Sequence, residues 1–271
     1  MNRRLILILG VILIAIVLSI ALIIKKSVGL SKDKTNKINS ISNLLTTARD
    51  AELKGNLLGA KTAYQKLVNN FSNSNEIMNW QKKIEELNIK ILFSPTITPK
   101  SVPYTIKPGD TLAKIAKEFN TTVELLKKSN NLADDKILPG KKIKVWTGHF
   151  SILVYKSQNI LILKSDEEII KTYVVSTGAN NHTPVGTFKI VEKLINPTWF
   201  KAGAVVPPNS PENVLGTRWL GFDLTGYGIH GTTDPQSLGK QVTQGCVRMS
   251  NPEVEELYTI VPRDTEVTIV D

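Results

Sequence analysis

An uncharged apolar run near the amino terminus constrains the fold of this chain more than any other feature. It extends from Leu5 to Ile24 and is interrupted only by Gly10 and Ser19. At about 1.5 Å per residue, a helix of that length spans roughly 30 Å, the thickness of a bilayer core. A buried helix of a soluble domain seldom lacks polar positions for so long, and a signal peptide has a shorter apolar region followed by a cleavage site. We therefore predict a transmembrane anchor within residues 1–30.

The charge distribution divides the chain into two halves. Residues 1–148 contain 24 Lys and Arg against 11 Asp and Glu, whereas residues 149–271 contain 10 against 13. The basic excess of the first half favours an anionic surface such as lipid headgroups or acidic wall polymer. Nucleic-acid binding would need a basic patch interleaved with aromatic residues, which the sequence lacks. Basic residues flank the apolar run on both sides, so the positive-inside rule alone does not orient the anchor.

Helical periodicity extends through residues 41–92. Apolar residues recur at three- and four-residue spacing, and breaks at Gly55 and at 70–75 divide the pattern into three helices. Gly59 and Tyr64 make the middle of the segment similar to one tetratricopeptide unit. A solenoid needs about three such units to bury a continuous core. We therefore expect a short helical stalk that contacts a protein partner, with a peptide-binding groove as the alternative.

A proline-rich segment and a small α+β unit follow the helices. Residues 93–103 contain three prolines among threonines and predict an extended linker. Within residues 104–146 the pattern predicts a short strand, two short helices and a closing strand. The turn before the first of these helices contains glycine and aspartate, and a threonine follows as the helix cap.

Four short motifs make residues 104–146 similar to the lysin motif. They are Tyr104-Thr-Ile-Lys-Pro-Gly-Asp-Thr-Leu, Ile115-Ala116, Asn130-Asn131-Leu132 and Ile137-Leu-Pro-Gly. The resemblance implies binding of N-acetylglucosamine-containing glycans, chiefly peptidoglycan, in a shallow groove. It assigns that groove to Gly109, Asp110, Thr111 and the loop that begins at Asn131. The alternative is a small α+β domain without a binding role.

Residues 149–271 have the pattern of a mainly β domain. Short apolar runs between turn residues indicate a mostly antiparallel sandwich or open barrel. The expected strands are 151–155, 160–163, 169–176, 186–191, 219–224 and 267–270. One helix is expected over 251–261, with Asn251 as its cap. A long proline-rich loop over 195–218, which contains Trp199, is typical of a lid over a site.

Cys246 is the only cysteine of the chain and cannot form an internal disulfide. A free thiol has a pKa of about 8.5 and is mostly protonated at neutral pH, so a nucleophilic role would require a base. His230, sixteen positions upstream, supplies one if the two segments lie side by side. A buried cysteine acting as a small hydrophobic residue is the alternative. His149 and His182 lack the spacing of metal ligands, so we expect neither a metal nor a cofactor.

Four further motifs make this segment similar to the L,D-transpeptidase catalytic domain. They are Val174-Val-Ser-Thr-Gly178, Thr183-Pro-Val-Gly-Thr-Phe188, Gly228-Ile-His-Gly-Thr232 and Gly245-Cys-Val-Arg-Met-Ser-Asn251. The resemblance implies that Cys246 attacks a tetrapeptide stem of peptidoglycan, expels the terminal D-alanine and forms 3→3 cross-links. His230 would be the base, and the carbonyl of Gly231 would orient its ring. The backbone N–H groups of Gly245 and Cys246 would bind the oxyanion.

Substrate contacts are expected from three further residues. Arg248 would hold a substrate carboxylate or brace its loop, and Trp199 would contact substrate from the lid. The family usually has Ser-His-Gly-Cys where this chain has Thr-Gln-Gly-Cys at 243–246. Gln244 can form hydrogen bonds but cannot titrate. We interpret the exchange as tolerated, with a lower rate or a different acceptor as the alternative.

Three other functions remain as alternatives. An L,D-carboxypeptidase would use the same thioester with water as the acceptor. An inactive, membrane-tethered protein that binds the wall would explain Gln244. A sortase also combines cysteine, histidine and arginine, but the lysin motif and the close spacing of Cys246 and Arg248 count against it. The two assigned domains would place the body of this single-pass protein outside the cytoplasm, facing the cell wall.

Overall fold

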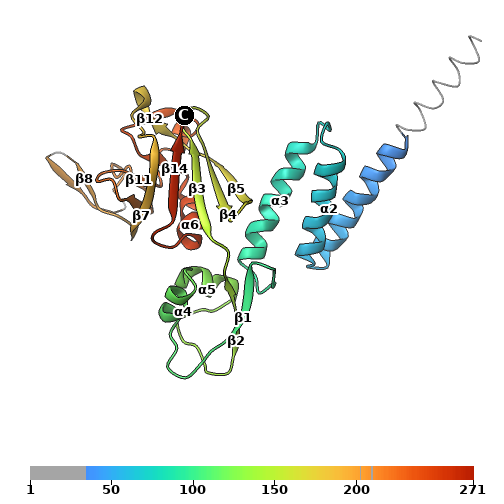
Figure 1. The fold of residues 1–271 in the computed structure, drawn as a ribbon. Coiled ribbons are helices and arrows are strands. Elements are labelled where there is room, and N and C mark those ends of the chain that lie inside the picture. The colour runs from blue at the N-terminus through green and yellow to red at the C-terminus, as the bar shows by residue number, and fades with distance from the viewer. Residues whose placement is uncertain (1–34, 202, 209) are drawn as a thin grey trace, which may run out of the picture. The chain divides into compact units, whose positions relative to one another are not determined.

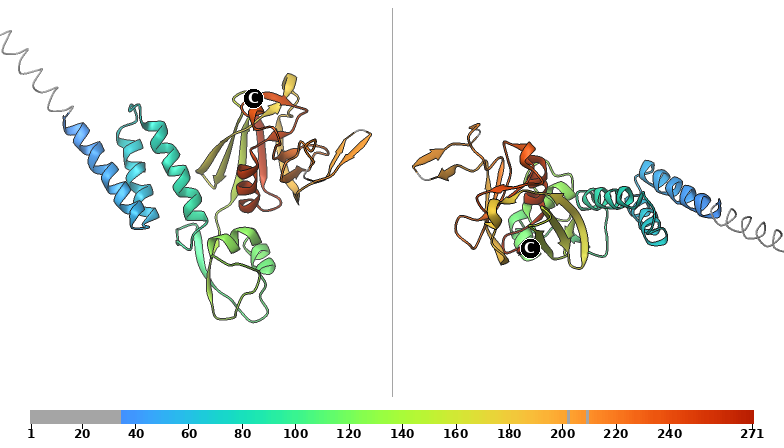
Figure 2. Two further views of the ribbon diagram at one scale, coloured as in Figure 1. Left: turned by 180° about the vertical axis from the view of Figure 1, so that it is seen from behind. Right: turned by 90° about the horizontal axis from the view of Figure 1, so that it is seen from above.

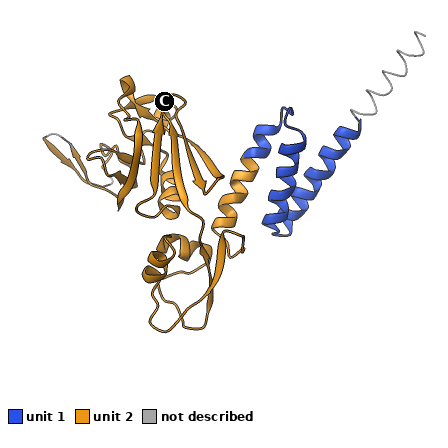
Figure 3. Ribbon diagram, viewed as in Figure 1, with its two compact units in different colours: residues 1–81 blue, residues 82–271 orange. Residues whose placement is uncertain are grey.

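The computed structural model describes residues 35–201, 203–208 and 210–271. The predicted transmembrane run, residues 5–24, lies outside them. Within the described ranges, no helix combines the length and apolar character needed to cross a membrane. The chain divides after Gln81 into two compact units, which Figure 3 distinguishes by colour.

The first unit is helical. Residues 35–53 form one helix, α2 spans Leu57–Asn70, and α3 begins within this unit and spans Ile77–Leu92 (Figure 1). Gly55, with a φ of +69°, ends the first helix, a conformation that suits glycine. The side chain of Asn56 then caps α2 by accepting a hydrogen bond from the N–H of Gly59 at 2.9 Å. The three predicted helices and their two breaks are therefore confirmed.

The second unit opens with the predicted strand, helix, helix, strand arrangement. Strands β1 (Ser101–Thr105) and β2 (Lys142–Trp146) pair antiparallel and enclose α4 (Leu112–Glu118) and α5 (Val123–Ser129). A small cluster of buried apolar side chains holds these elements together. Strand β1 begins three residues earlier than expected, because Ser101, Val102 and Pro103 pair with β2. Proline is tolerated there because this sheet has only two strands, both of them edges.

The segment expected to be an extended linker is tied to the second unit. The buried ammonium of Lys144 donates to the carbonyls of Ile91 at 2.5 Å and Ser94 at 2.8 Å, at the end of α3. Ile89 and Leu92 on the same helix belong to the large apolar cluster of the mainly β domain. The boundary between compact units therefore lies inside α3 and not at the proline-rich segment.

The mainly β domain is built on one mixed sheet of eight strands, in the order β13-β11-β10-β7-β14-β3-β4-β5. The strands are β3 (Phe150–Tyr155), β4 (Ile160–Ser165), β5 (Glu168–Val174), β7 (Gly186–Ile195), β10 (Arg218–Phe222), β11 (Gly228–His230), β13 (Val247–Arg248) and β14 (Glu266–Val270). Two pairs, β14·β3 and β11·β13, are parallel, and the others are antiparallel. Most of the expected strands are therefore confirmed.

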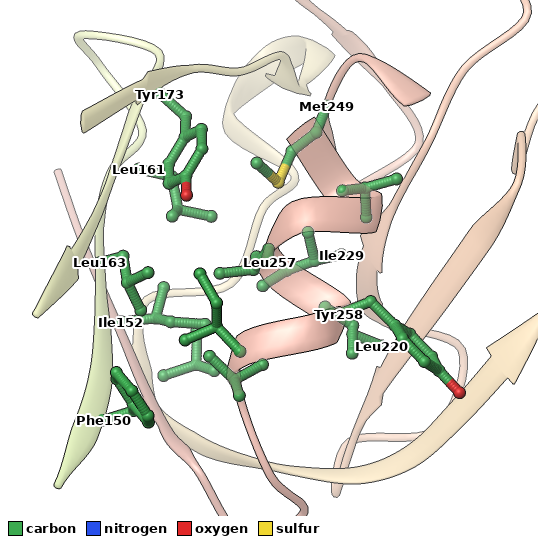
Figure 4. Close-up of a cluster of buried hydrophobic side chains, with 14 of the residues drawn as sticks. Phe150, Ile152, Leu161, Leu163, Tyr173, Leu220, Ile229, Met249, Leu257 and Tyr258 are labelled. Carbon is green, nitrogen blue, oxygen red and sulfur yellow. The ribbon is translucent and has the colours of Figure 1, made fainter. Parts of the chain in front are cut away.

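The core of this domain lies between the sheet and helix α6 (Asn251–Ile260). Figure 4 shows side chains from strands on both sides of α6, including Ile152, Leu163 and Leu220, meeting around Leu257. The two views of Figure 2 show the strands curving about this helix. A curved sheet filled by a helix corresponds to the open-barrel alternative. The sandwich is wrong, because no second sheet of comparable size occurs among the described residues.

Two expectations about local structure are corrected. The predicted loop over 195–218 contains a hairpin, in which β8 (Trp199–Lys201) pairs with β9 (Ala204–Val206). Gly203 has a φ of +78° within its turn. The cap of α6 is Ser250, whose hydroxyl accepts from the N–H of Glu253, and not Asn251. Two short strands, β6 (Thr177–Gly178) and β12 (Gln241–Thr243), form a separate parallel pair that no sequence pattern predicted.

Candidate active site

The parallel pairing of β11 with β13 brings the histidine and cysteine segments together. Ile229 pairs with Val247 and His230 with Arg248. Cys246, which immediately precedes β13, therefore lies beside Gly228, the first residue of β11. Cys246 and His230 line one cleft of 640 Å³. The segments that contain His230 and Cys246 therefore lie side by side, as the sequence prediction required.

His230 is held as a neutral base. The residue is only 3% exposed, and its Nδ1 lies 2.6 Å from the carbonyl oxygen of Gly231. A carbonyl can only accept, so Nδ1 carries the proton and Nε2 keeps a lone pair. Burial lowers the pKa of His230 to about 4; the bond to Gly231 opposes this and the charge of Arg248 adds to it. The ring orientation expected of Gly231 is present.

Cys246 is held as a thiol. Burial raises its pKa above the ordinary value, while the N–H of Gly228 and the charge of Arg248 act in the opposite direction. The Sγ–H group donates to the carbonyl of Gly226 at 3.5 Å. Because the thiol and the imidazole are both neutral at pH 7, the nucleophile has to be generated when substrate is bound, by proton transfer to His230.

Asn251 fixes the loop that orients the imidazole. Its side-chain oxygen accepts hydrogen bonds from the N–H groups of Thr217 at 3.1 Å and Thr232 at 3.0 Å. A Cβ atom on Gly231 or Gly216 would lie 2.2 Å from this oxygen, so both positions require glycine. This role of Asn251 is not predictable from the sequence, because asparagine and serine are equally good helix caps and Asn251 directly follows Ser250.

One of the two predicted oxyanion donors, the N–H of Gly245, has an acceptor within its own turn. The N–H of Gly245 donates to Thr243 Oγ1 at 3.2 Å, and that hydroxyl donates in turn to the carbonyl of Cys246 at 2.6 Å. Gly245 has a φ of +130°, and a Cβ atom there would lie 2.7 Å from the ring of Tyr227. This turn needs glycine for its shape and directs the N–H inward. Oxyanion binding by the N–H groups of Gly245 and Cys246 stays a prediction.

The three expected substrate contacts all line the same cleft. Arg248 donates from Nη1 to Ser237 Oγ at 3.0 Å, which braces the 3-10 turn Pro235–Ser237, while its buried Nε has no partner among the described residues. Gln244 is exposed at the rim. Trp199 reaches the cleft from strand β8 of the hairpin. Trp219, which no sequence motif indicated, also lines the cleft, and its indole stacks on the ring of His230 with centroids 6.1 Å apart.

The predicted glycan-binding residues have structural roles in the small α+β domain. Asp110 accepts from the hydroxyl of Tyr104 at 2.9 Å and from the N–H of Lys107 at 2.8 Å. Thr111 caps α4, and Gly109 has a φ of +84° in the preceding turn. Asn131 is exposed after α5. Their contact with glycan stays a prediction.

Across the part of the chain that the structure describes, no group of three or more His, Cys, Asp or Glu side chains is placed to hold a metal ion.

Comparison with known proteins gives two domain matches. A model of the YkuD L,D-transpeptidase catalytic domain matches residues 149–269, and a LysM domain model matches residues 104–146. The putative L,D-transpeptidase YkuD of Bacillus subtilis (strain 168) is 34% identical over 173 residues, which are 61% of this chain and 97% of that protein.

Two further proteins of the same organism are similar over shorter stretches. The putative L,D-transpeptidase YqjB is 40% identical over 126 residues, covering 44% of this chain and 70% of that protein. The cell wall-binding protein YocH is 41% identical over 76 residues, which are 27% of this chain and 26% of YocH.

Alkylation with iodoacetamide will report the state of the single thiol. Because burial raises the pKa of Cys246, we expect slow alkylation at pH 7 and a rate that still rises above about pH 8.5, where an ordinary thiol is half ionised. The same protein unfolded in guanidinium chloride is the control and should follow the ordinary curve. A plateau reached near pH 6 would show a thiolate–imidazolium pair and contradict the neutral assignment.

Replacement of Asn251 tests the support of the Gly231 loop. In Asn251→Ala, two backbone N–H groups lose their acceptor, which costs about 1–3 kcal/mol per buried group. We expect lower stability in thermal unfolding and loss of the protected Nδ1 proton signal of His230 in NMR spectra. Asn251→Asp keeps an acceptor oxygen and should preserve both. Retention of the Nδ1 proton signal in both variants would show that Asn251 is not needed to hold the Gly231 loop.

Proposed function

Because this chain belongs to the family of L,D-transpeptidases with a YkuD catalytic domain, we propose that it cross-links peptidoglycan by cysteine acyl transfer. The observation that carries the proposal is the pair formed by Cys246 and His230 in one cleft, with the imidazole neutral and its Nδ1 held by Gly231. This geometry is suited to general-base activation of a thiol.

The first half of the reaction forms a thioester. His230 Nε2 takes the proton from Cys246 as Sγ attacks the carbonyl carbon of the third stem residue. The N–H of Cys246 donates to the oxyanion of the tetrahedral intermediate. The intermediate then collapses, the peptide bond to the terminal D-alanine breaks, and the imidazolium returns the proton to the leaving amine.

The second half transfers the acyl group. A side-chain amine of a neighbouring stem attacks the thioester carbonyl, His230 takes the proton from that amine, and Cys246 leaves as a thiol after reprotonation. The product is an amide between two third residues, a 3→3 cross-link. If water attacked instead, the same thioester would be hydrolysed, and the protein would be an L,D-carboxypeptidase.

The remaining cleft residues bind substrate in this proposal. Arg248 is half-buried and has an unpartnered Nε among the described residues, so its guanidinium both braces the turn at Ser237 and faces a substrate carboxylate. Gln244 replaces the usual histidine and contributes hydrogen bonds without a charge change. Trp199 and the β8–β9 hairpin act as the lid that contacts the stem peptide.

We further propose where the protein acts. The LysM match and the similarity to a cell wall-binding protein support binding of the glycan strands by residues 104–146, with Gly109, Asp110, Thr111 and Asn131 at the groove. The apolar run at residues 5–24 would anchor the chain as a single-pass membrane protein with its catalytic domain outside the cytoplasm. The helical segment would then space the enzyme from the bilayer and contact a protein partner.

Mass spectrometry of tetrapeptide-stem muropeptides incubated with the full chain in detergent tests the reaction. We expect dimers that have lost one terminal alanine, and loss of this product by at least about 1,000-fold in Cys246→Ala and His230→Ala. His149→Ala, a change of an exposed histidine in the same domain, is the matched control and should retain activity.

Two other outcomes of the muropeptide experiment would replace the proposed function. Cysteine-dependent loss of alanine without dimers would replace the proposal with a carboxypeptidase. Absence of both products, while the protein still sediments with insoluble peptidoglycan, would identify a wall-binding protein without activity and implicate Gln244.

Cell fractionation tests the anchor. We expect the full chain to sediment with membranes and to be released by detergent, whereas a variant lacking residues 1–34 should remain in the soluble fraction at low and high salt. Protease added to intact cells from which the wall has been removed should degrade the body of the full chain. Equal sedimentation of both proteins would refute the anchor, and protection from protease would refute the orientation.

A further inference from the structure

Two rows of residues cross the sheet beneath the cleft. In the first, Trp219 pairs with Leu194 on one side and His230 on the other, and His230 pairs with Arg248. In the second, two residues further along, Glu192 pairs with Gly221 and Gly221 pairs with Gly228. Side chains two residues apart on a strand point to the same face. The second row therefore carries glycines between Glu192 and the position beside Cys246.

The indole of Trp219 fills the space above these glycines. A Cβ atom on Gly221 would lie 2.6 Å from Nε1, and one on Gly228 would lie 2.9 Å from the benzo carbons Cζ2 and Cη2. The indole therefore forms a flat surface in the cleft, with its benzo edge over Gly228, the residue beside Cys246. Its Nε1–H group donates to Glu192 Oε2 at 2.9 Å, so the carboxylate marks the far end of that surface.

Charge in the cleft is confined to its two ends. Among the described lining residues, Glu192 is the only carboxylate, and Arg248 is the only permanently charged cation. Glu192 is exposed, and one of its carboxylate oxygens accepts a hydrogen bond from the indole N–H, which orients the group. The other oxygen has no hydrogen bond to any residue that the structure describes. The cleft therefore offers an oriented anion above an aromatic surface.

From this arrangement we infer that Glu192 recognises the side-chain ammonium of the third residue of the donor stem, an inference that rests on the proposed function. Cys246 and Glu192 are three strand spacings apart, about 14 Å. A side chain of lysine length, roughly 6 Å from Cα to ammonium, spans the gap together with the glutamate side chain. Its methylene groups would lie on the face of the Trp219 indole, and its ammonium would lie beyond the ring, against the second carboxylate oxygen of Glu192.

The donor ammonium, and not that of the acceptor, fits this position. The acceptor amine has to reach the thioester carbon at Cys246, at the opposite end of the indole. A donor amine held by Glu192 stays protonated and away from its own thioester. Glu192 is thus a specificity residue that selects donor stems with a cationic third residue.

Donor stems that differ only in the third residue test the inference. With the full chain, Glu192→Gln should raise KM about tenfold for a tetrapeptide stem with lysine at the third position, because a charged hydrogen bond is lost. With the same separate amine acceptor present in both assays, it should leave kinetics unchanged for the stem with norleucine, which lacks the amine. Glutamine keeps an acceptor oxygen for the indole, so the ring stays in place. Glu212→Gln, the same charge change outside the cleft, should change neither.

Binding of donor stems to an inactive variant tests the role of Glu192 independently of the proposed reaction. In the Cys246→Ala background, calorimetry should show about tenfold weaker binding of the lysine stem after Glu192→Gln and equal binding of the norleucine stem. The binding comparison does not require turnover. If the native protein turned over no stem at all, only the proposed function would be refuted. Equal losses for both stems would assign Glu192 a merely structural role at Trp219. No loss for either stem would overturn the inference.

Discussion

The candidate site depends on the parallel pairing of two very short strands at the edge of the sheet. Strand β13 has no hairpin connection to β11, and its two residues cannot form a stable pair alone. The N–H of Met249 extends the ladder by donating to the carbonyl of His230 at 2.8 Å. Helix α6 begins directly after this point, and the apolar core beneath it holds the pair in register.

Asn251 connects that core to the chemistry of the site. It occupies the first turn of α6, where its backbone belongs to the helix and its side chain reaches the loop after His230. The carbonyl of Gly231 is thereby fixed in front of Nδ1. Packing of α6 consequently determines which tautomer of His230 faces the cleft. The neutral states of the buried imidazole and of the partly buried thiol then follow from the reduced access of water to both groups.

The cleft combines this reactive pair with an asymmetric binding surface. Arg248 lies beyond His230 in one row of the sheet, and Glu192 lies at the far end of the neighbouring row. Trp219 separates the carboxylate from the thiol by the length of its indole. A substrate with a carboxylate and an ammonium at opposite ends would be bound in a single orientation.

The sequence by itself determined the elements and the reactive pair. Period-3.6 and alternating patterns located the helices and longer strands, and Cys246, His230 and Gly231 were identified from their motifs. Tertiary structure decided what local patterns cannot encode, because strands of two or three residues have too few side chains to show a period. It formed a hairpin within the loop at 195–218, gave the N–H of Gly245 an acceptor within its own turn, and joined Glu192 to Trp219 across strands. Each of these depends on partners distant in sequence.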